Sequence, residues 1–114
     1  MVTKTLWIKD HYLAQILEGR KTIEVRVAYA NIARLQPGDR LLLNEQHAFT
    51  IRRIGRYATF EELLAHEDRA AIAPDLPPGD LLQALRDLYP PEKEALGVVA
   101  LEIARLPDAS AQSG

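Results

Sequence analysis

The sequence contains no cysteine, which excludes disulfide bonds and metal sites built from thiolates. This absence is typical of proteins in a reducing compartment, so we expect a cytoplasmic protein. Serine occurs only at Ser110 and Ser113, and neither lies in a nucleophile motif. No window approaches the roughly 18 apolar residues of a membrane span, and the first ten residues lack the apolar core of a signal peptide. We therefore expect no association with a membrane.

The chain has 114 residues, 47% of them hydrophobic and 26% charged, which is ordinary for one compact domain. Its net charge of −2 argues against a general polyanion binder. The charge is unevenly distributed, however. Residues 1–57 hold ten Lys/Arg and five Asp/Glu, whereas residues 58–114 hold four and eleven. Either the first half presents a basic face to a phosphate backbone, or the second half simply forms solvated acidic helices.

Apolar periodicity predicts the secondary structure. Strands are expected at 6–8, 22–27, 40–45, 48–57 and 96–106. Helices are expected at 10–18, at 60–72 with breaks, and from the N-cap Asp80 to about residue 89. Asp10 is the expected N-cap of the first helix, and Thr59 with Glu62 forms a capping box for the second. The last strand is apolar on nearly every residue from Val98 to Leu101, which is typical of a central strand covered on both faces.

Within the strand 48–57, the alternation of apolar residues breaks at Ile54, beside Gly55, which predicts a β-bulge. Bulges bend strands as barrel closure requires. The pattern thus predicts an α+β fold, a small, partly open β-barrel of about five to six strands with packed helices. We expect one domain over residues 1–106 and a disordered tail over 107–114.

The segment Gly19–Arg26 carries the strongest functional signal. Gly19 ends a helix, and a strand then opens with three charged residues among apolar ones. Glu24 and Arg26, two residues apart on a strand, project to the same face. Lys21 belongs to the opposite face of a regular strand, but it joins them if it lies in the turn that follows Gly19. The alternative is an ordinary surface ion pair.

Other chemical signals are weaker. His11, His47 and His66 have no ligand spacing, so we expect no metal and no cofactor. The pair Arg52–Arg53 is basic and lies near aromatic residues, which is typical of a nucleic-acid patch and also of many barrel exteriors. Glu67 has no distinguishing mark of its own.

The segment Gly19–Arg26 resembles the G-x-K-x-x-E-x-R signature of the ASCH domain, a small barrel similar to the PUA fold. The likeness continues through the Pro37–Asp39 turn, the Phe60–Leu64 helix with Glu67, and the segments Leu88–Pro90 and Gly97–Glu102. The resemblance implies a cleft beside the barrel that binds RNA or nucleotides.

One bacterial branch of this family acts as an amidohydrolase on N4-acetylcytidine through a Lys, a Thr and a Glu, and other members are reported to cleave RNA. Carried over by position, these roles fall to Lys21 and Glu67. The threonine is not matched, because Glu24 occupies its position. A carboxylate is a poor acyl nucleophile, so the resemblance does not extend to that mechanism.

Three functional hypotheses remain. In the first, which we favour, a cleft binds RNA, a nucleotide or a nucleoside, with Lys21 and Arg26 on phosphate, Glu24 on a base edge, and contributions from Glu67, Tyr89 and Arg53. In the second, the cleft belongs to a hydrolase in which Lys21 stabilises negative charge and Glu24 or Glu67 acts as general base. In the third, the acidic helices dock a protein. The sequence predicts no oligomeric state.

Overall fold

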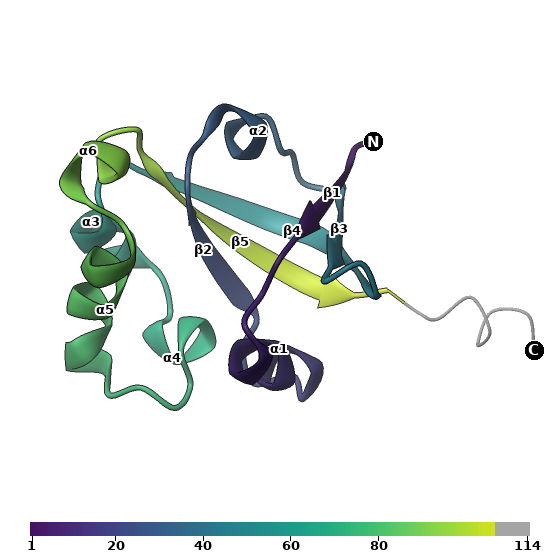
Figure 1. Cartoon of the computed structure of the whole chain (residues 1–114), viewed down its shortest axis with the longest axis horizontal. Helices are drawn as coiled ribbons and strands as arrows, with labels where there is room; N and C mark the ends of the chain where they lie inside the picture. The colour runs from purple at the N-terminus through teal and green to yellow at the C-terminus, as the bar shows by residue number, and fades with distance from the viewer. Residues whose placement is uncertain (107–114) are drawn as a thin grey trace, which may run out of the picture.

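The computed structural model describes residues 1–106, which form five strands and six α-helices (Figure 1). The elements follow in the order β1 (Thr3–Leu6), α1 (Asp10–Leu17), β2 (Ile23–Val27), α2 (Ala30–Ala33), β3 (Arg40–Leu43), β4 (His47–Tyr57), α3 (Phe60–His66), α4 (Arg69–Ile72), a 3₁₀ turn (Pro78–Asp80), α5 (Leu81–Leu88), α6 (Pro91–Glu94) and β5 (Val98–Arg105). The tail predicted over 107–114 lies outside the described residues.

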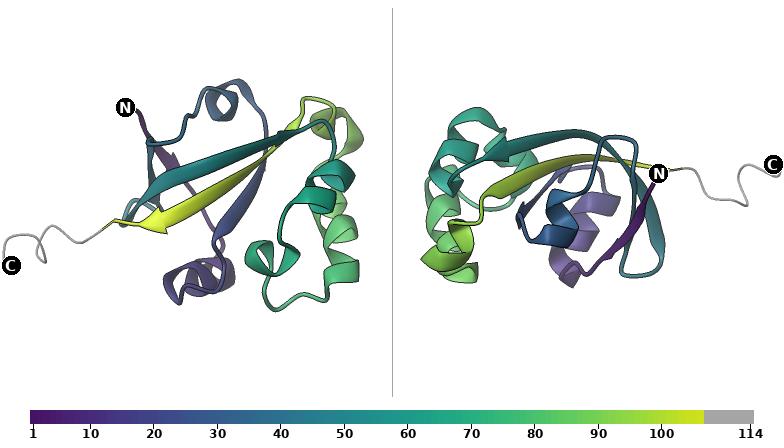
Figure 2. Two further views of the ribbon diagram at one scale, coloured as in Figure 1. Left: turned by 180° about the vertical axis from the view of Figure 1, so that it is seen from behind. Right: turned by 90° about the horizontal axis from the view of Figure 1, so that it is seen from above.

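The strands form one mixed sheet in the order β1-β3-β4-β5-β2, in which only the β1–β3 pair is parallel. Figure 2 shows how the sheet curls along the long strands β4 and β5. The predicted α+β fold with a partly open barrel is confirmed. Because the sheet does not close, β1 and β2 are left as its two edges.

Two apolar cores cover the two faces of the sheet. The first lies inside the half-barrel, where residues such as Leu41, Ile51 and Leu101 pack with Ile16 of α1. The second lies between the outer face of β2 and β5 and the helices α3, α4 and α5, with Phe60 fully buried in it. Figure 1 shows these helices gathered at the end of the sheet away from the N-terminus and from the last residues of β5. As predicted, β5 is a central strand covered on both faces.

The predicted bulge in β4 is present, but it lies at Arg52 rather than at Ile54. Ile51 pairs with Ile103, and Arg53 pairs with Glu102, so two steps on β4 match one step on β5. The extra residue returns Ile54 to the same face as Ile51. A break in alternation therefore shows that a residue has been inserted, but not which one.

The prediction of the first strand at 6–8 was wrong, because the strand spans Thr3–Leu6. Asn44, in the left-handed region with φ of 53°, ends the ladder. Its side chain accepts a hydrogen bond from Ile8 N at 2.7 Å and donates one to Ile8 O at 2.9 Å, so that it takes the place of a paired strand. Trp7, between the buried Leu6 and Ile8, points outward and is 64% exposed.

The predicted helix ends are partly confirmed. Gly19 follows α1 with φ of 82°, and the Thr59 hydroxyl accepts a hydrogen bond from Glu62 N at 3.1 Å. The N-cap of α1, however, is Lys9, and Asp10 is the first helical residue. At that position the negative charge of Asp10 interacts favourably with the positive end of the helix dipole, but its side chain does not cap the helix.

Candidate functional site

The site is built on the edge strand β2. Ile23, Val25 and Val27 are buried against the helices, and Glu24 and Arg26 project to the other side of the sheet, as the alternation predicts. Because β2 is an edge, these two side chains lie at the open seam of the half-barrel. Arg26 bridges that seam by donating from Nη2 to the carbonyl of Trp7 at 3.0 Å.

Lys21 comes just before β2 and is 96% shielded from solvent, with only 4% of its surface exposed. Its Nζ donates to the carbonyls of Ile23 and Ile72, each at 2.7 Å, and lies 3.2 Å from Oε1 of Glu24. These three acceptors match the three N–H bonds of an ammonium group. The turn after Gly19 thus brings Lys21 to Glu24 although the two are three residues apart.

Glu24 joins the two cations. Its Oε2 accepts from Nε of Arg26 at 2.7 Å, and its Oε1 faces Lys21. The prediction that these three side chains converge is confirmed, and we refer to them as the Lys21–Glu24–Arg26 cluster. Within residues 1–106, two of the five N–H bonds of Arg26 are engaged, by Glu24 and Trp7, and the other three have no partner.

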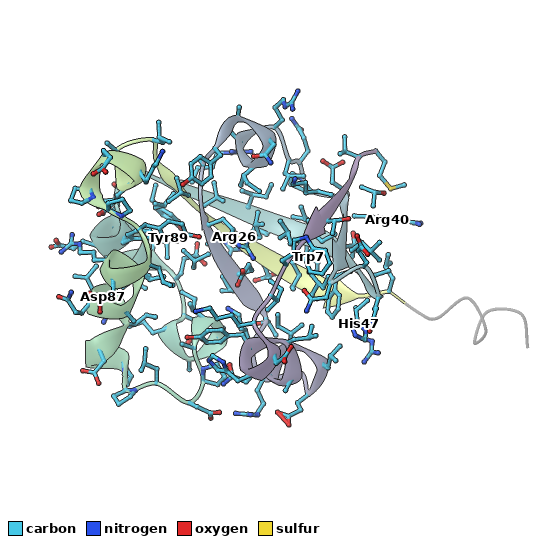
Figure 3. All side chains as sticks on the ribbon, viewed as in Figure 1. Trp7, Arg26, Arg40, His47, Asp87 and Tyr89 are labelled. Carbon is cyan, nitrogen blue, oxygen red and sulfur yellow. The ribbon has the colours of Figure 1, made fainter. Side chains whose placement is uncertain are left out.

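The cluster forms one wall of a cavity of about 480 Å³, which we call the main cavity. Apolar and aromatic walls come from Tyr12 of α1 and from Leu81, Leu85 and Tyr89 on and after α5. Its charged lining comprises three cations (Lys9, Lys21, Arg26) and two carboxylates (Glu24, Asp87), a balance of +1 with His11 neutral. Figure 3 shows Arg26 on β2 between Tyr89 and Trp7.

Burial shifts the titration of two of these groups. It lowers the pKa of Lys21, because the charged form has lost water, and the adjacent Glu24 carboxylate offsets part of that effect. Burial also raises the pKa of the Tyr89 hydroxyl. At neutral pH, Tyr89 is thus a neutral aromatic wall with a hydroxyl group that can donate a hydrogen bond.

Glu67 does not join Lys21 in this cavity, contrary to the sequence-based expectation. It lies at the end of α3, where its carboxylate accepts two hydrogen bonds from Arg53, at 3.0 and 2.6 Å, and one from the Tyr57 hydroxyl. Arg53 aligns with Glu102 and Ile23, so it points to the face of the sheet opposite Glu24. Arg53 and Glu67 therefore form a separate pair that ties α3 to β4.

We expect this pair to make the protein sensitive to acid. Arg53 holds the pKa of Glu67 below its ordinary value of 4.5, so the carboxylate stabilises the fold above that pH and progressively less as the pH falls through it. Glu67→Gln should lower the free energy of unfolding by about 1–3 kcal/mol at pH 7 and weaken the loss of stability between about pH 5 and pH 3. Urea unfolding at a series of pH values measures both effects. Glu61→Gln, at an exposed position, is the control, and a Glu67→Gln profile parallel to the parent's would contradict the assignment.

Sequence reasoning missed most of the cavity walls. The sequence places Tyr12, Leu81 and Leu85 within predicted helices and Trp7 within a predicted strand, and it marks none of them as lining a cavity. One signal was available for Trp7, because a large aromatic residue between two buried neighbours on an extended segment must face outward. Nothing in the periodicity of α5 separates residues that line a cavity from residues that fill a core.

The ASCH domain model matches residues 6–107. The chain belongs to the ASCH domain family. Its structure is similar to the crystal structure of hypothetical protein PH0355, with a TM-score of 0.84 and 26% identity over 93% of this chain and 100% of that one. It also resembles the solution structure of protein PF0455 from Pyrococcus furiosus, with a TM-score of 0.76 and 27% identity over 95% of this chain and 100% of that one.

No curated protein matches the sequence of this ASCH domain. In residues 1–106, every helix is too short or too polar to span a bilayer.

Proposed function

We propose that this ASCH domain, formed by residues 1–106, binds single-stranded RNA or a free nucleotide by enclosing a base in the main cavity. The observation that supports this most is the pairing of aromatic and aliphatic walls with a cluster of mixed charge. A volume of about 480 Å³ lies within the range of small-ligand pockets. Members of the family are generally linked to RNA binding, and a cytoplasmic location fits such a role.

The geometry suggests a role for each charged group. Each Glu24 oxygen is paired with one cation and retains a lone pair, so the carboxylate can accept from the amino group of a base. In the part of the chain that the structure describes, Arg26 keeps N–H bonds without a partner, and these can donate to a phosphate or a base carbonyl. Lys21 has all three N–H bonds engaged within the protein, so we assign it to holding Glu24 in place rather than to contacting phosphate.

The charge of the cavity favours a nucleotide over a nucleoside. The net charge of the lining side chains, +1, matches the single negative charge of one phosphodiester. A groove that bound only phosphate would not need the carboxylate of Glu24. Tyr12 and Tyr89 provide π surfaces on which any base can stack. This arrangement discriminates weakly between bases and binds the phosphate through charge. We therefore expect the affinity for nucleotides to fall as the salt concentration is raised.

Binding is tested by titrating isotope-labelled protein with the four nucleoside 5′-monophosphates and following backbone amide shifts. We expect the largest shifts in residues 21–26. Arg26→Ala should weaken binding about ten-fold or more, because it removes a charge-assisted contact. Arg52→Ala removes an exposed arginine at the β4 bulge and should bind normally. Shifts confined to other regions, or none, would refute the proposal.

A small hydrolase that cleaves RNA or a modified nucleoside is the second candidate. It is favoured by Lys21, a buried lysine of lowered pKa in a cavity wall, which is common at catalytic sites. Among the described residues that line the main cavity there is no serine, threonine or cysteine, so the nucleophile would be water with Glu24 as its base. Products that form with the parent protein and vanish in Glu24→Gln, with ligand binding retained, would favour this reaction over binding alone.

A further inference from the structure

A second, smaller cavity of about 230 Å³ adjoins the main cavity, and we call it the side cavity. The two share three lining residues, Trp7, Arg26 and Tyr89. The Arg26 side chain, held to Glu24 on one side and to the Trp7 carbonyl on the other, therefore forms the partition between them. Arg26 is thus a lining residue of both hollows.

The chemistry of the two cavities differs. The main cavity has carboxylates among its cations, whereas the side cavity, as far as the described residues line it, has Lys4 and Arg26 and no carboxylate. A mixed-charge wall suits the donors and acceptors of a base edge, and an all-cationic wall suits phosphate. The side cavity also offers the amide of Asn31, and within residues 1–106 neither Lys4 nor Asn31 has a side-chain hydrogen-bond partner.

Aromatic side chains frame the side cavity. Trp7 is 64% exposed and Tyr29 is 38% exposed, which is unusual for residues of this size in a domain with few aromatics. Lys93 lies over the Tyr29 ring, with its Nζ 5.7 Å from the ring centroid, and adds a third cation beside this wall. Exposed aromatics interleaved with cations are the pattern by which proteins bind single-stranded nucleic acid without strong sequence preference.

From these features we infer that the domain binds two successive nucleotides of single-stranded RNA. The base of one nucleotide occupies the main cavity, the neighbouring nucleotide lies in the side cavity against Trp7 and Tyr29, and Arg26 binds the phosphodiester between them. Lys4 and Asn31 contact the second nucleotide. This inference rests on the proposed function, since it extends the same site.

Trp7 is the single tryptophan of the chain, so its fluorescence reports directly on the partition. The experiment compares each nucleoside 5′-monophosphate with the corresponding 5′-phosphorylated homodinucleotide and with the nucleoside 5′-diphosphate, at one salt concentration. We expect the best dinucleotide to bind at least ten-fold more tightly than its monophosphate. Lys4→Ala and Asn31→Ala should each weaken dinucleotide binding about five-fold and leave monophosphate binding unchanged.

Arg40→Ala is the control. Like Lys4, Arg40 is a cation on a strand, but it lines neither cavity and its side chain points away from both (Figure 3). A dinucleotide that binds no more tightly than the monophosphate, or than the diphosphate, would overturn the second subsite and leave the proposed function standing. Equal effects of Lys4→Ala on both ligands would do the same. Failure of every nucleotide to bind would overturn both.

Discussion

Replacement of Glu24 by glutamine is expected to lower the free energy of unfolding by about 2–4 kcal/mol at neutral pH. Glu24 supplies the negative charge between two cations, one of which, Lys21, is buried. Glutamine has nearly the same shape but no charge, so the Lys21 ammonium group would remain in the protein interior facing only neutral dipoles. Removing one partner of a buried ion pair lowers the free energy of unfolding more than losing a surface ion pair does.

The pH dependence of this variant identifies Lys21 as the cause. Burial lowers the pKa of Lys21 and Glu24 raises it, so the pKa should fall further in Glu24→Gln. Between the lowered folded pKa and the ordinary value of 10.5, the unfolded chain binds more protons than the folded chain, so stability rises with pH. In the variant this rise begins at a lower pH. The deficit relative to the parent should therefore shrink as the pH increases through the interval between the two folded pKa values.

Denaturant unfolding of the parent and the variant from pH 6 upward measures this convergence. Glu18→Gln is a matched control, because Glu18 pairs with Arg20 at 2.8 Å on the exposed end of α1. Its effect should stay within about 0.5 kcal/mol at all pH values. A Glu24→Gln deficit that is constant with pH would mean that Lys21 does not carry the cost.

The Lys21–Glu24–Arg26 cluster was predictable because its members are close in sequence. Alternation places Glu24 and Arg26 on one face of a strand, and a glycine in the left-handed region gives Lys21 the turn that it needs to reach them. Local rules suffice for contacts made within six residues.

The grouping of Glu67 could not be predicted in the same way. Its partners come from β4, and which face of β4 it meets depends on the insertion at Arg52. A single extra residue moves every later side chain to the opposite face, and the pattern of apolar residues allowed that insertion anywhere between Ile51 and Ile54. The cavity walls depend in the same way on long-range packing, because residues of α1 and α5 line the same cavity beside β2 although 63 residues of chain (18–80) separate the two helices.

A methyl group at position 55 is expected to destabilise the fold by about 2–4 kcal/mol, although Gly55 has no unusual backbone conformation. A Cβ there would lie 2.8 Å from the Tyr57 hydroxyl and closer still to Oε2 of Glu67. The Glu67 side chain can move away, but only by giving up its hydrogen bonds with Arg53 and Tyr57. The cost of Gly55→Ala therefore combines the loss of these charged hydrogen bonds with displacement of the Tyr57 ring, whose Cε2 and hydroxyl would each lie 2.8 Å from the new Cβ.

Gly79→Ala is the matched control, since a Cβ at Gly79 meets open space and its φ is not in the left-handed region. Its effect on the unfolding free energy should be within about 0.5 kcal/mol. A double-mutant cycle with Glu67→Ala isolates the cause, because the methyl group should cost much less once the carboxylate is absent. If the effects of the two changes on the unfolding free energy were additive, the methyl group would destabilise the fold only through its contact with Tyr57. The Arg53–Glu67 pair would then not depend on the absence of a side chain at position 55.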